Sequence, residues 1–432
     1  MSGSRQDIPW LLGSWPGRVE LRRRYSRRMW PLTSRIAALH RSTLGRDARV
    51  VAVVGSVGKT TTMRAVSAAL GVPVHPLALL NGNSNSALAG LLLRIGPRQK
   101  HAVLEVAING PGEMGRYAAV VRPDVAVVTA IASDHWRSFR SLDEIRDEKQ
   151  LMVQALPDDG LAVLNADDPQ VRYMGGQTRA RVVMFGSSSD ADFRATDIEL
   201  DWPRGTRFVV HAAGISRPVR TRLIGTHMVY PALAAIAVAT AEGVLLDAAI
   251  ASVSELEPTP GRMEPHLLAG GAVALQDDFK GSEATFGPAL DTLAAVPARR
   301  RVVVLGGIDD YAGAENAAYR EIGKRVAAVA DRVIVVGRFR KRYRSSLTSA
   351  RLPPDHVSSV ADVHAAIRIL RAELGPGDVV LIKGRSQQTL GRIALALAGR
   401  DVRCRADPCP FRRMYCAICP LLETEFEGAP RR

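Results

Sequence analysis

One short segment constrains the fold of this chain more than any other: a run of β-branched residues, a glycine turn and the start of a helix follow one another directly. Residues 50–54 read Val-Val-Ala-Val-Val, residues 55–60 read Gly-Ser-Val-Gly-Lys-Thr, and helix-forming residues begin at Met63. Glycines let backbone N–H groups approach phosphate oxygens, and the amino end of a helix adds partial positive charge. The segment therefore predicts a parallel sheet that carries a phosphate-binding loop at its edge.

Two side chains of this loop predict its ligands. Lys59 can reach the β and γ phosphates of a nucleotide, and the Thr60 hydroxyl can hold Mg²⁺. The strict phosphate-loop pattern needs a glycine where this chain has Val53, but the shorter pattern G-x-x-G-K-T-T is present. We expect ATP and Mg²⁺ to bind here, with the nucleotide at Gly55, Ser56, Val57, Gly58, Lys59, Thr60 and Thr61.

Beyond the loop, short β-branched runs alternate with Ala- and Leu-rich segments, which is typical of α/β folds with parallel strands. Strands are expected at 50–54, 102–106, 125–130, 162–165, 182–185, 273–275, 301–305, 332–336 and 378–382. The alternating run 208–213 suggests a strand of a different, more exposed sheet. The segment Glu-Pro-Thr-Pro-Gly at 257–261 indicates a linker.

The predicted fold class is therefore α/β, in four parts. We expect an N-terminal helical arm at 1–49 and a P-loop parallel-sheet ATPase domain at 50–258. A smaller Rossmann-like α/β domain at 259–400 and a C-terminal four-cysteine module at 401–432 complete the chain.

Most of the excess positive charge lies in the arm. The chain has 58 Lys and Arg against 43 Asp and Glu, a net charge of +15, and the first 49 residues hold eleven Arg and three acidic residues. Apolar residues recur there every three or four positions, which predicts an amphipathic helix: Leu21, Tyr25, Met29, Leu32, Ile36 and Leu39. We expect this stripe to pack on the body of the protein, with docking to an anionic membrane surface or a protein partner as the alternative. Because the excess is local, we do not expect a nucleic-acid partner.

Composition and hydropathy limit the class of protein. Hydrophobic residues make up 47% of the chain and charged residues 23%, which excludes a disordered chain. No apolar run reaches the roughly 18 residues of a membrane-spanning helix, and residues 1–13 are too weakly apolar for a secretory signal. We expect a cytoplasmic protein, associated with a membrane if the arm docks on lipid.

All four cysteines lie in the last 29 residues, in the pattern C-x4-C-x6-C-x2-C: Cys404, Cys409, Cys416 and Cys419. A secreted protein held by disulfides would spread its cysteines through the fold. Only the last pair has the spacing of a zinc knuckle, and the first pair is slightly long. We predict a closed structural Zn²⁺ site, with an iron–sulfur cluster or free or disulfide-forming thiols as alternatives.

The shorter phosphate-loop pattern is the one that Mur ligases use, and the chain resembles that family over residues 50–400, most closely its D-Ala-D-Ala-adding members. The likeness continues at 104–106, 112–114, 123–135, 149, 165–169, 225–227, 260–262, 277–278, 304–307 and 377–384. It implies an ATP-dependent, ADP-forming amide ligase: MgATP phosphorylates a carboxylate, and an amine attacks the acyl phosphate. The acid and the amine would be small molecules or cell-envelope precursors.

Three residues are expected to complete the metal site beside Thr60. Glu105 ends a hydrophobic strand, where a carboxylate is explained if it faces Mg²⁺, although a satisfied strand-end carboxylate is the alternative. The resemblance implies that His135 helps to bind a second Mg²⁺. It also implies that Lys149 is carbamylated, which turns a cation into an anion that can hold the metal.

The resemblance implies further roles in the last domain. Arg262 would contact ATP, Asp278 would bind the ribose or the incoming domain, and Lys383 would lie near the reacting phosphate. The expected catalytic residues are Lys59, Lys149, His135 and Lys383. Only seven residues of the chain are lysines, and four of them fall on motif positions: Lys59, Lys149, Lys280 and Lys383.

Three departures from the family pattern bear on the substrate. Only 49 residues precede the first strand, where the family has a domain for a UDP-sugar, so a different carboxylate substrate is expected. The family's His-Asn-x-x-Asn, which contacts adenine, reads His-Met-Val-Tyr-Pro at 227–231, and its Tyr-Asn-Ala-Asn reads Phe-Lys-Gly-Ser at 279–282. Adenine recognition and the amine or acid should therefore differ.

Two rival functions stay open from the sequence. A poly-γ-glutamate synthetase or a glutaminase-coupled amidating ligase would consume ATP with free glutamate or ammonia. A non-catalytic nucleotide-sensing scaffold would keep the phosphate loop without ligase activity, and the altered residues 227–231 favour it most.

Overall fold

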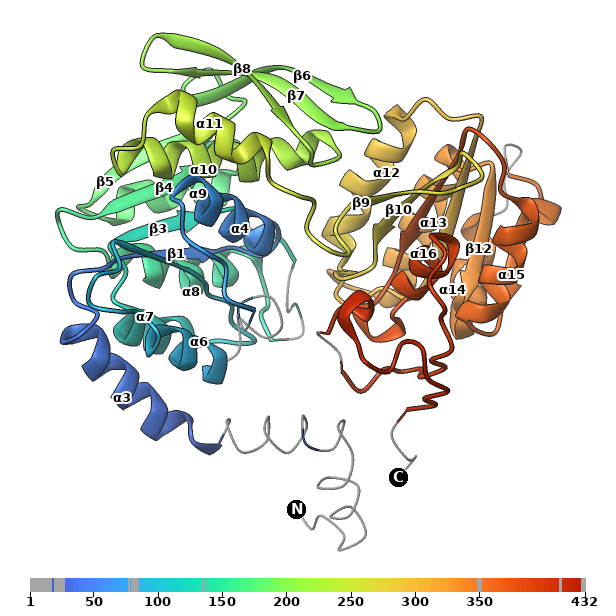
Figure 1. The fold of residues 1–432 in the computed structure, drawn as a ribbon, viewed down its shortest axis with the longest axis horizontal. Helices are drawn as coiled ribbons and strands as arrows, with labels where there is room; N and C mark the ends of the chain where they lie inside the picture. The colour runs from blue at the N-terminus through green and yellow to red at the C-terminus, as the bar shows by residue number, and fades with distance from the viewer. Residues whose placement is uncertain are drawn as a thin grey trace, which may run out of the picture.

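Two β-sheets, each with its own covering helices, form two lobes (Figure 1). The structure is a computed structural model, and it describes residues 18, 28–76, 78, 85–133, 136, 138–347, 352–411 and 414–428.

The first lobe is built on an eight-stranded sheet in the order β2-β1-β3-β4-β5-β6-β7-β8. The first six strands in this order, β2-β1-β3-β4-β5-β6, pair in parallel. Val53 of β1 lies between Glu105 of β2 and Val127 of β3. The central strands are Val-rich because helices cover both of their faces. The strands are β1 (Arg49–Val54), β2 (His101–Glu105), β3 (Val125–Val128), β4 (Leu161–Asn165), β5 (Arg181–Gly186), β6 (Phe193–Asp201), β7 (Gly205–Ala212) and β8 (Ile215–Thr221).

The expectation of a separate, more exposed sheet at 208–213 is wrong. That run belongs to β7, which pairs antiparallel with β6 and β8 and so extends the first sheet. The prediction missed β6 and β8 of this sheet, and β9 (Glu264–Leu267) and β13 (Val357–Val360) of the second lobe. Of these, β8 contains Pro218 and two arginines. An edge strand tolerates these residues because one of its sides has no neighbouring strand.

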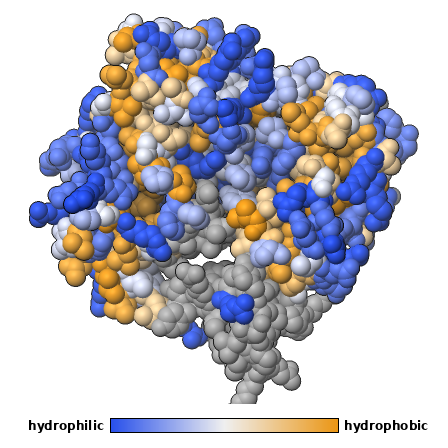
Figure 2. Space-filling model, in the orientation of Figure 1, coloured by the Kyte–Doolittle hydropathy of each residue, from blue (hydrophilic) through white to orange (hydrophobic). Residues whose placement is uncertain are grey.

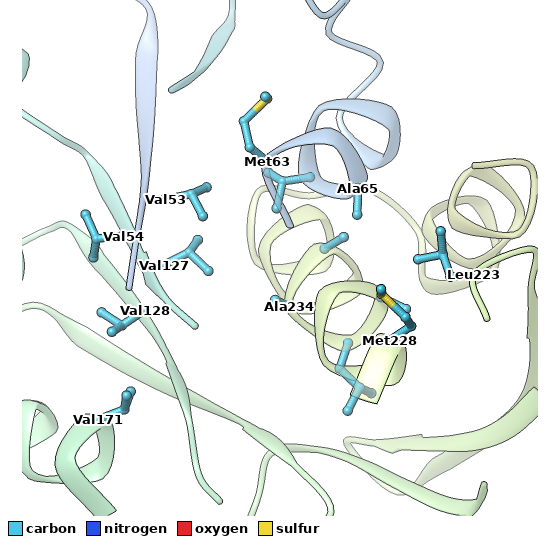
Figure 3. Close-up of a cluster of buried hydrophobic side chains, with 14 of the residues drawn as sticks. Val53, Val54, Met63, Ala65, Val127, Val128, Val171, Leu223, Met228 and Ala234 are labelled. Carbon is cyan, nitrogen blue, oxygen red and sulfur yellow. The ribbon is translucent and has the colours of Figure 1, made fainter. Parts of the chain in front are cut away.

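Helices cover the two faces of the parallel part of this sheet. Figure 3 shows Val53 and Val127 pointing toward Met63 of α4 and Ala234 of α10, whereas Val54 lies on the other side of its strand. This alternation is the two-residue period of a strand, and helices α7 and α8 pack on the opposite face (Figure 1). The helices of this lobe are α4 (Lys59–Ala69), α6 (Asn85–Leu92), α7 (Met114–Val121), α8 (Leu142–Gln154), α9 (Pro169–Met174), α10 (Val229–Ala241) and α11 (Leu246–Ser254).

The second lobe has a six-stranded sheet in the order β13-β12-β11-β14-β10-β9, parallel except for β9. Val304 packs in a core with Ile367 of α15 and Ile393 of α16, whereas Val303 faces the core that contains Phe286 of α12. The strands are β9 (Glu264–Leu267), β10 (Val273–Asp277), β11 (Arg300–Leu305), β12 (Arg332–Val336), β13 (Val357–Val360) and β14 (Asp378–Lys383). The helices are α12 (Phe286–Ala295), α13 (Glu315–Val329), α14 (Arg340–Leu347), α15 (Val363–Glu373) and α16 (Gly391–Leu397).

The N-terminal helix α3 (Trp30–Ser42) begins with Pro31 in its first turn, as predicted, but its apolar stripe does not pack on the body. The buried side of α3 is formed by Ala37 and Arg41. Arg41 donates to the backbone carbonyl of Val121 and pairs with Asp124 at 2.7 Å, which fixes that side of the helix to the first lobe. The stripe faces outward instead, with 51%, 48% and 64% of Leu32, Ile36 and Leu39 exposed. Leu21 and Tyr25 lie outside the described residues.

The surface is mixed in hydropathy. On the face drawn in Figure 2, hydrophobic residues are spread over both lobes among hydrophilic ones, and the hollow between the lobes carries mainly hydrophilic residues. Within the described ranges, every helix is too short or too polar to span a membrane.

Candidate active site

A cavity of about 640 Å³ lies between the two lobes. It is lined from the first sheet by the loops that follow β1, β2 and β3, and from the second by those that follow β10, β11 and β14. The carboxyl ends of both parallel sheets therefore open onto one space, which is the usual place for a ligand in such folds.

The phosphate loop has the predicted geometry. It joins β1 to α4, and Gly55 and Gly58 have φ angles of +141° and +82°, which favour glycine. A Cβ atom at Gly55 would lie 2.0 Å from the Thr129 Oγ1, so no side chain fits there. Lys59 Nζ donates to the carbonyls of Gly55 and Ser56 at 2.9 Å, which holds the ammonium along the loop. Residues 56–62 line the cavity.

Thr60 is one of the residues through which the two lobes are in contact. Its hydroxyl donates to Glu105 Oε2 at 2.6 Å and accepts from Arg262 Nη2 at 2.9 Å. Thr60 and Glu105 are both buried, and the hydrogen bond between them turns the carboxylate toward the loop. The expected binding of Mg²⁺ by Glu105 stays a prediction. The hydroxyl and carboxylate oxygens are ligands of the hard type that Mg²⁺ prefers. This contact also brings Arg262 from the second lobe to the nucleotide loop, while its expected contact with ATP stays a prediction.

Lys149 lies beneath the loop, outside the cavity lining. It is 2% exposed on α8, and its Nζ donates to the Gly55 carbonyl at 2.9 Å. Its amine therefore supports the backbone that precedes Lys59. His135, the other predicted metal ligand, lies outside the described residues.

Lys383 projects into the cavity from the end of β14. Its Nζ pairs with Asp277 Oδ2 at 2.6 Å and donates to the Lys280 carbonyl at 2.9 Å. The ammonium also lies 5.2 Å from the centre of the Phe286 ring. Lys383 is 1% exposed, so Asp277 compensates a charge that is almost fully buried.

Asp278 does not line the cavity, although the sequence suggested a contact with the ribose or the incoming domain. Its carboxylate accepts from Gln276 Nε2 and from the backbone N–H of Gly391, where α16 begins. Burial raises the pKa of Asp278. The neighbouring Asp277 faces the cavity instead, because successive residues of a strand end point to opposite sides.

A less polar part of the cavity lies near the start of α10. It is lined by Phe185, Met228, Tyr230 and Pro231. Met228 and Pro231 stand where the family motif has its two amides. Tyr230 Oη donates to Asp167 at 2.9 Å. Burial alone would raise the pKa of Asp167, but hydrogen bonds from the residues at 187 and 188 lower it to about 2. The carboxylate therefore stays ionised and fixes the Tyr230 ring.

The predicted four-cysteine metal centre is not confirmed. The four cysteines line one small cavity, together with Arg392 and apolar side chains. In the part of the chain that the structure describes, however, no three or more His, Cys, Asp or Glu side chains are arranged to hold a metal ion. The described cysteines form no disulfide.

Among the cavity residues that sequence reasoning did not name, three carry polar groups from different segments. Arg385 follows β14 and pairs with Asp309, which follows β11, at 2.8 Å. Tyr415 comes from the four-cysteine tail. For Arg385 and Asp309 the available signal was their position just after buried strands. For Tyr415 the sequence holds no signal, because its place depends on how the tail folds back.

Comparison with known protein families gives two matches. Residues 53–239 match the Mur ligase middle domain, and residues 261–386 match the Mur ligase glutamate ligase domain.

Similar proteins of known name and structure agree with these matches. UDP-N-acetylmuramoyl-tripeptide–D-alanyl-D-alanine ligase of Mycobacterium tuberculosis H37Rv is 31% identical over 375 residues, which cover 82% of this chain and 73% of that protein. The enzyme of the same name from Escherichia coli K12 is 29% identical over 354 residues, or 81% of this chain and 77% of that one.

Among solved structures, MurF from Acinetobacter baumannii gives a TM-score of 0.75 at 22% identity, covering 86% of this chain and 81% of that one. MurF ligase from Thermotoga maritima, solved with ADP, gives a TM-score of 0.74 at 21% identity, covering 85% and 83%. At these identities the structural likeness concerns the fold.

Proposed function

The chain belongs to the Mur ligase family of ATP-dependent, ADP-forming amide ligases, and from that premise we propose that it joins a cell-envelope precursor carboxylate to an amine through an acyl phosphate. The similarity to D-alanyl-D-alanine ligases favours this reaction over that of a polyglutamate-synthetase-like or amidating ligase, and over a nucleotide-sensing scaffold without activity. The observation that carries the proposal is the contact of Thr60 with both Glu105 and Arg262, since it joins the nucleotide loop to the second lobe inside one cavity.

Each lobe has its own task in this proposal. We assign ATP binding to residues 50–258 and presentation of the amine to residues 259–400. Mg²⁺, held by Thr60 and Glu105 and further by His135 and a carbamylated Lys149, would neutralise phosphate charge when bound. Lys59 and Lys383 approach the same cavity from opposite lobes. Their ammonium groups can stabilise the negative charge that develops as the γ-phosphoryl group moves to the carboxylate.

The position of the proposed reaction, in a cavity between the two lobes, supports a route through an acyl phosphate. A carboxylate oxygen attacks the γ-phosphorus, and the bond to ADP breaks. The amine then attacks the acyl carbon, and inorganic phosphate leaves with that carboxylate oxygen. The intermediate must be kept from water until the amine arrives, which a cavity between two lobes achieves.

The route is tested with a carboxylate labelled with ¹⁸O. The first pair to offer is the one named for the mycobacterial relative, UDP-N-acetylmuramoyl-tripeptide and D-alanyl-D-alanine, followed by other envelope peptides. We expect ADP release that depends on both substrates, one ¹⁸O in the released phosphate, and neither result with Lys59→Ala. Turnover without ¹⁸O transfer would contradict the acyl phosphate.

We retain zinc binding by the four cysteines as a proposal. It rests on their spacing and on their lining one cavity. Metal analysis of the purified protein should give about one zinc per chain, lost in the Cys416→Ser/Cys419→Ser double variant. A metal-free native protein, or one that holds iron, would refute zinc.

We also propose that helix α3 docks on an anionic membrane surface. Leu32, Ile36 and Leu39 form an exposed apolar row, and Arg35 beside them is exposed as well. Sedimentation with phosphatidylglycerol vesicles, but not with phosphatidylcholine vesicles, should be lost in Leu32→Ser/Ile36→Ser. Equal sedimentation of the native protein and this variant would refute the docking.

A further inference from the structure

The C-terminal tail, residues 401–428, returns to the cavity between the lobes. The backbone N–H of Cys409 donates to the carbonyl of Gln387, a cavity residue, at 2.8 Å. Arg392, 1% exposed on α16, donates to the carbonyls of Cys404 and Ala406. These contacts fix the tail behind the loop that follows β14. The tail lies beyond residue 386, where the family match ends.

Among the described residues of the tail, Tyr415 lines the cavity. Its ring stacks on Phe279, with centres 4.6 Å apart and planes 29° from parallel. Tyr415 shares the cavity lining with Lys59, Thr60 and Glu105. It is 8% exposed, so the ring is held in place by packing.

The Tyr415 hydroxyl is buried and has no partner of hydrogen-bonding geometry among the described residues. A buried polar group without a partner is costly, and such groups in a cavity often meet a ligand. A tyrosine hydroxyl carries a proton that it can donate in a hydrogen bond.

Arg262 shows what kind of ligand the hydroxyl can meet. Its guanidinium lies 5.0 Å from the Phe279 ring centre, and its Nη2 donates to Thr60. Its Nε is buried and, like the Tyr415 hydroxyl, has no partner within the described residues. Two buried donors near Lys59 and the expected Mg²⁺ ligands favour an anionic acceptor with several oxygens.

We infer that Tyr415 donates a hydrogen bond to the terminal phosphate of the bound nucleotide, so that the four-cysteine tail forms part of the ligase site. The inference rests on the proposed function, because it requires MgATP in this cavity. It gives the tail a role in binding the γ-phosphoryl group, which ATP has and ADP lacks.

The difference between ATP and ADP allows a test without the unknown substrates. Isothermal titration measures the affinity of the full-length protein for MgADP and for the Mg²⁺ complex of a β,γ-imido ATP analogue. Tyr415→Phe keeps the stacked ring and removes only the hydroxyl. We expect roughly tenfold or greater weakening for the analogue, the usual effect of one hydrogen bond to a charged group, and MgADP affinity within about twofold of native.

Tyr173→Phe is the matched control, since Tyr173 is 51% exposed and lies beside Arg146 on the first lobe. It should leave both affinities unchanged. Equal weakening for ADP and the analogue by Tyr415→Phe would overturn the inference and indicate a structural role, and so would no weakening.

The same titrations separate this inference from the proposed function. Native protein that binds both nucleotides, with Lys59→Ala losing them, upholds the nucleotide site even if Tyr415→Phe has no selective effect. Native protein that binds neither nucleotide overturns both proposals.

Discussion

The buried pair Lys383–Asp277 yields the prediction with the best-defined magnitude. Asp277→Asn removes the negative charge beside the Lys383 ammonium, which is 1% exposed. Among the described residues, the partners left to Lys383 are then the neutral amide at 277, the Lys280 carbonyl and the Phe286 ring. Breaking a buried ion pair by removing one charge costs roughly 3–5 kcal/mol, because the remaining charge is uncompensated. We expect the lower half of that range, since one hydrogen bond is retained.

The assay is unfolding in urea, monitored by tryptophan fluorescence and by circular dichroism. No tryptophan lies beyond residue 202, so tryptophan fluorescence does not report on the second lobe, whereas circular dichroism reports on both lobes. Asp277→Asn should lower the urea midpoint of the second lobe by about 1–3 M, from the usual slope for a domain. Asp291→Asn is the matched control: its pair with Arg325 at 2.8 Å is well exposed, and such pairs contribute about 0–1 kcal/mol.

The double variant Asp277→Asn/Lys383→Met tests whether the uncompensated charge is the cause. It removes both charges, so most of the stability lost in Asp277→Asn should return, while the ligase activity stays low because Lys383 is absent. The reasoning is refuted if Asp277→Asn costs no more than Asp291→Asn, or if the double variant is no more stable than the single one.

Three further predictions concern the nucleotide lobe. Gly55→Ala should abolish nucleotide binding in the titration described above, whereas Gly71→Ala, also at positive φ but facing open space, should cost only about 1 kcal/mol and bind normally. Burial lowers the pKa of His227 to about 4, so the unfolded chain binds more protons than the folded one between pH 6.5 and 4. The free energy of unfolding should therefore fall by roughly 3 kcal/mol as the pH drops through that window. His227→Gln should make the urea midpoint depend less on pH. Labelled bicarbonate should give a carbamate carbon signal by NMR that is absent in Lys149→Arg; its absence in the native protein would refute carbamylation.

The sequence was sufficient for the parallel core of both lobes, because Val-rich runs between helices have few alternatives. The edge strand β8 was missed, since Pro218 and its charged neighbours are tolerated only where no further strand pairs. The site was predictable where one motif sets the geometry, as at Gly55 and Thr60. It was not predictable where the choice depends on which side of a strand end faces the ligand, as for Asp277 and Asp278.

Contacts between distant segments set the other limit. Tyr415 is more than 130 residues from Phe279 in the chain, and no local pattern indicates that their rings stack. The outward row on α3 was misassigned for a related reason. Periodicity identifies an apolar face, but the buried side was decided by the bonds of Arg41 to the first lobe.

The scarcity of lysine, in contrast, was informative. Lys59, Lys280 and Lys383 line the cavity, and Lys149 supports the phosphate loop from below. The other three lysines are exposed: Lys100, Lys324 and Lys341. Fifty-one arginines show that the chain otherwise uses guanidinium for positive charge. A compact ammonium fits between backbone carbonyls in a narrow loop, as at Lys59 and Lys149, whereas a planar guanidinium does not. The carbamate proposed for Lys149 would also require an amine, which arginine lacks.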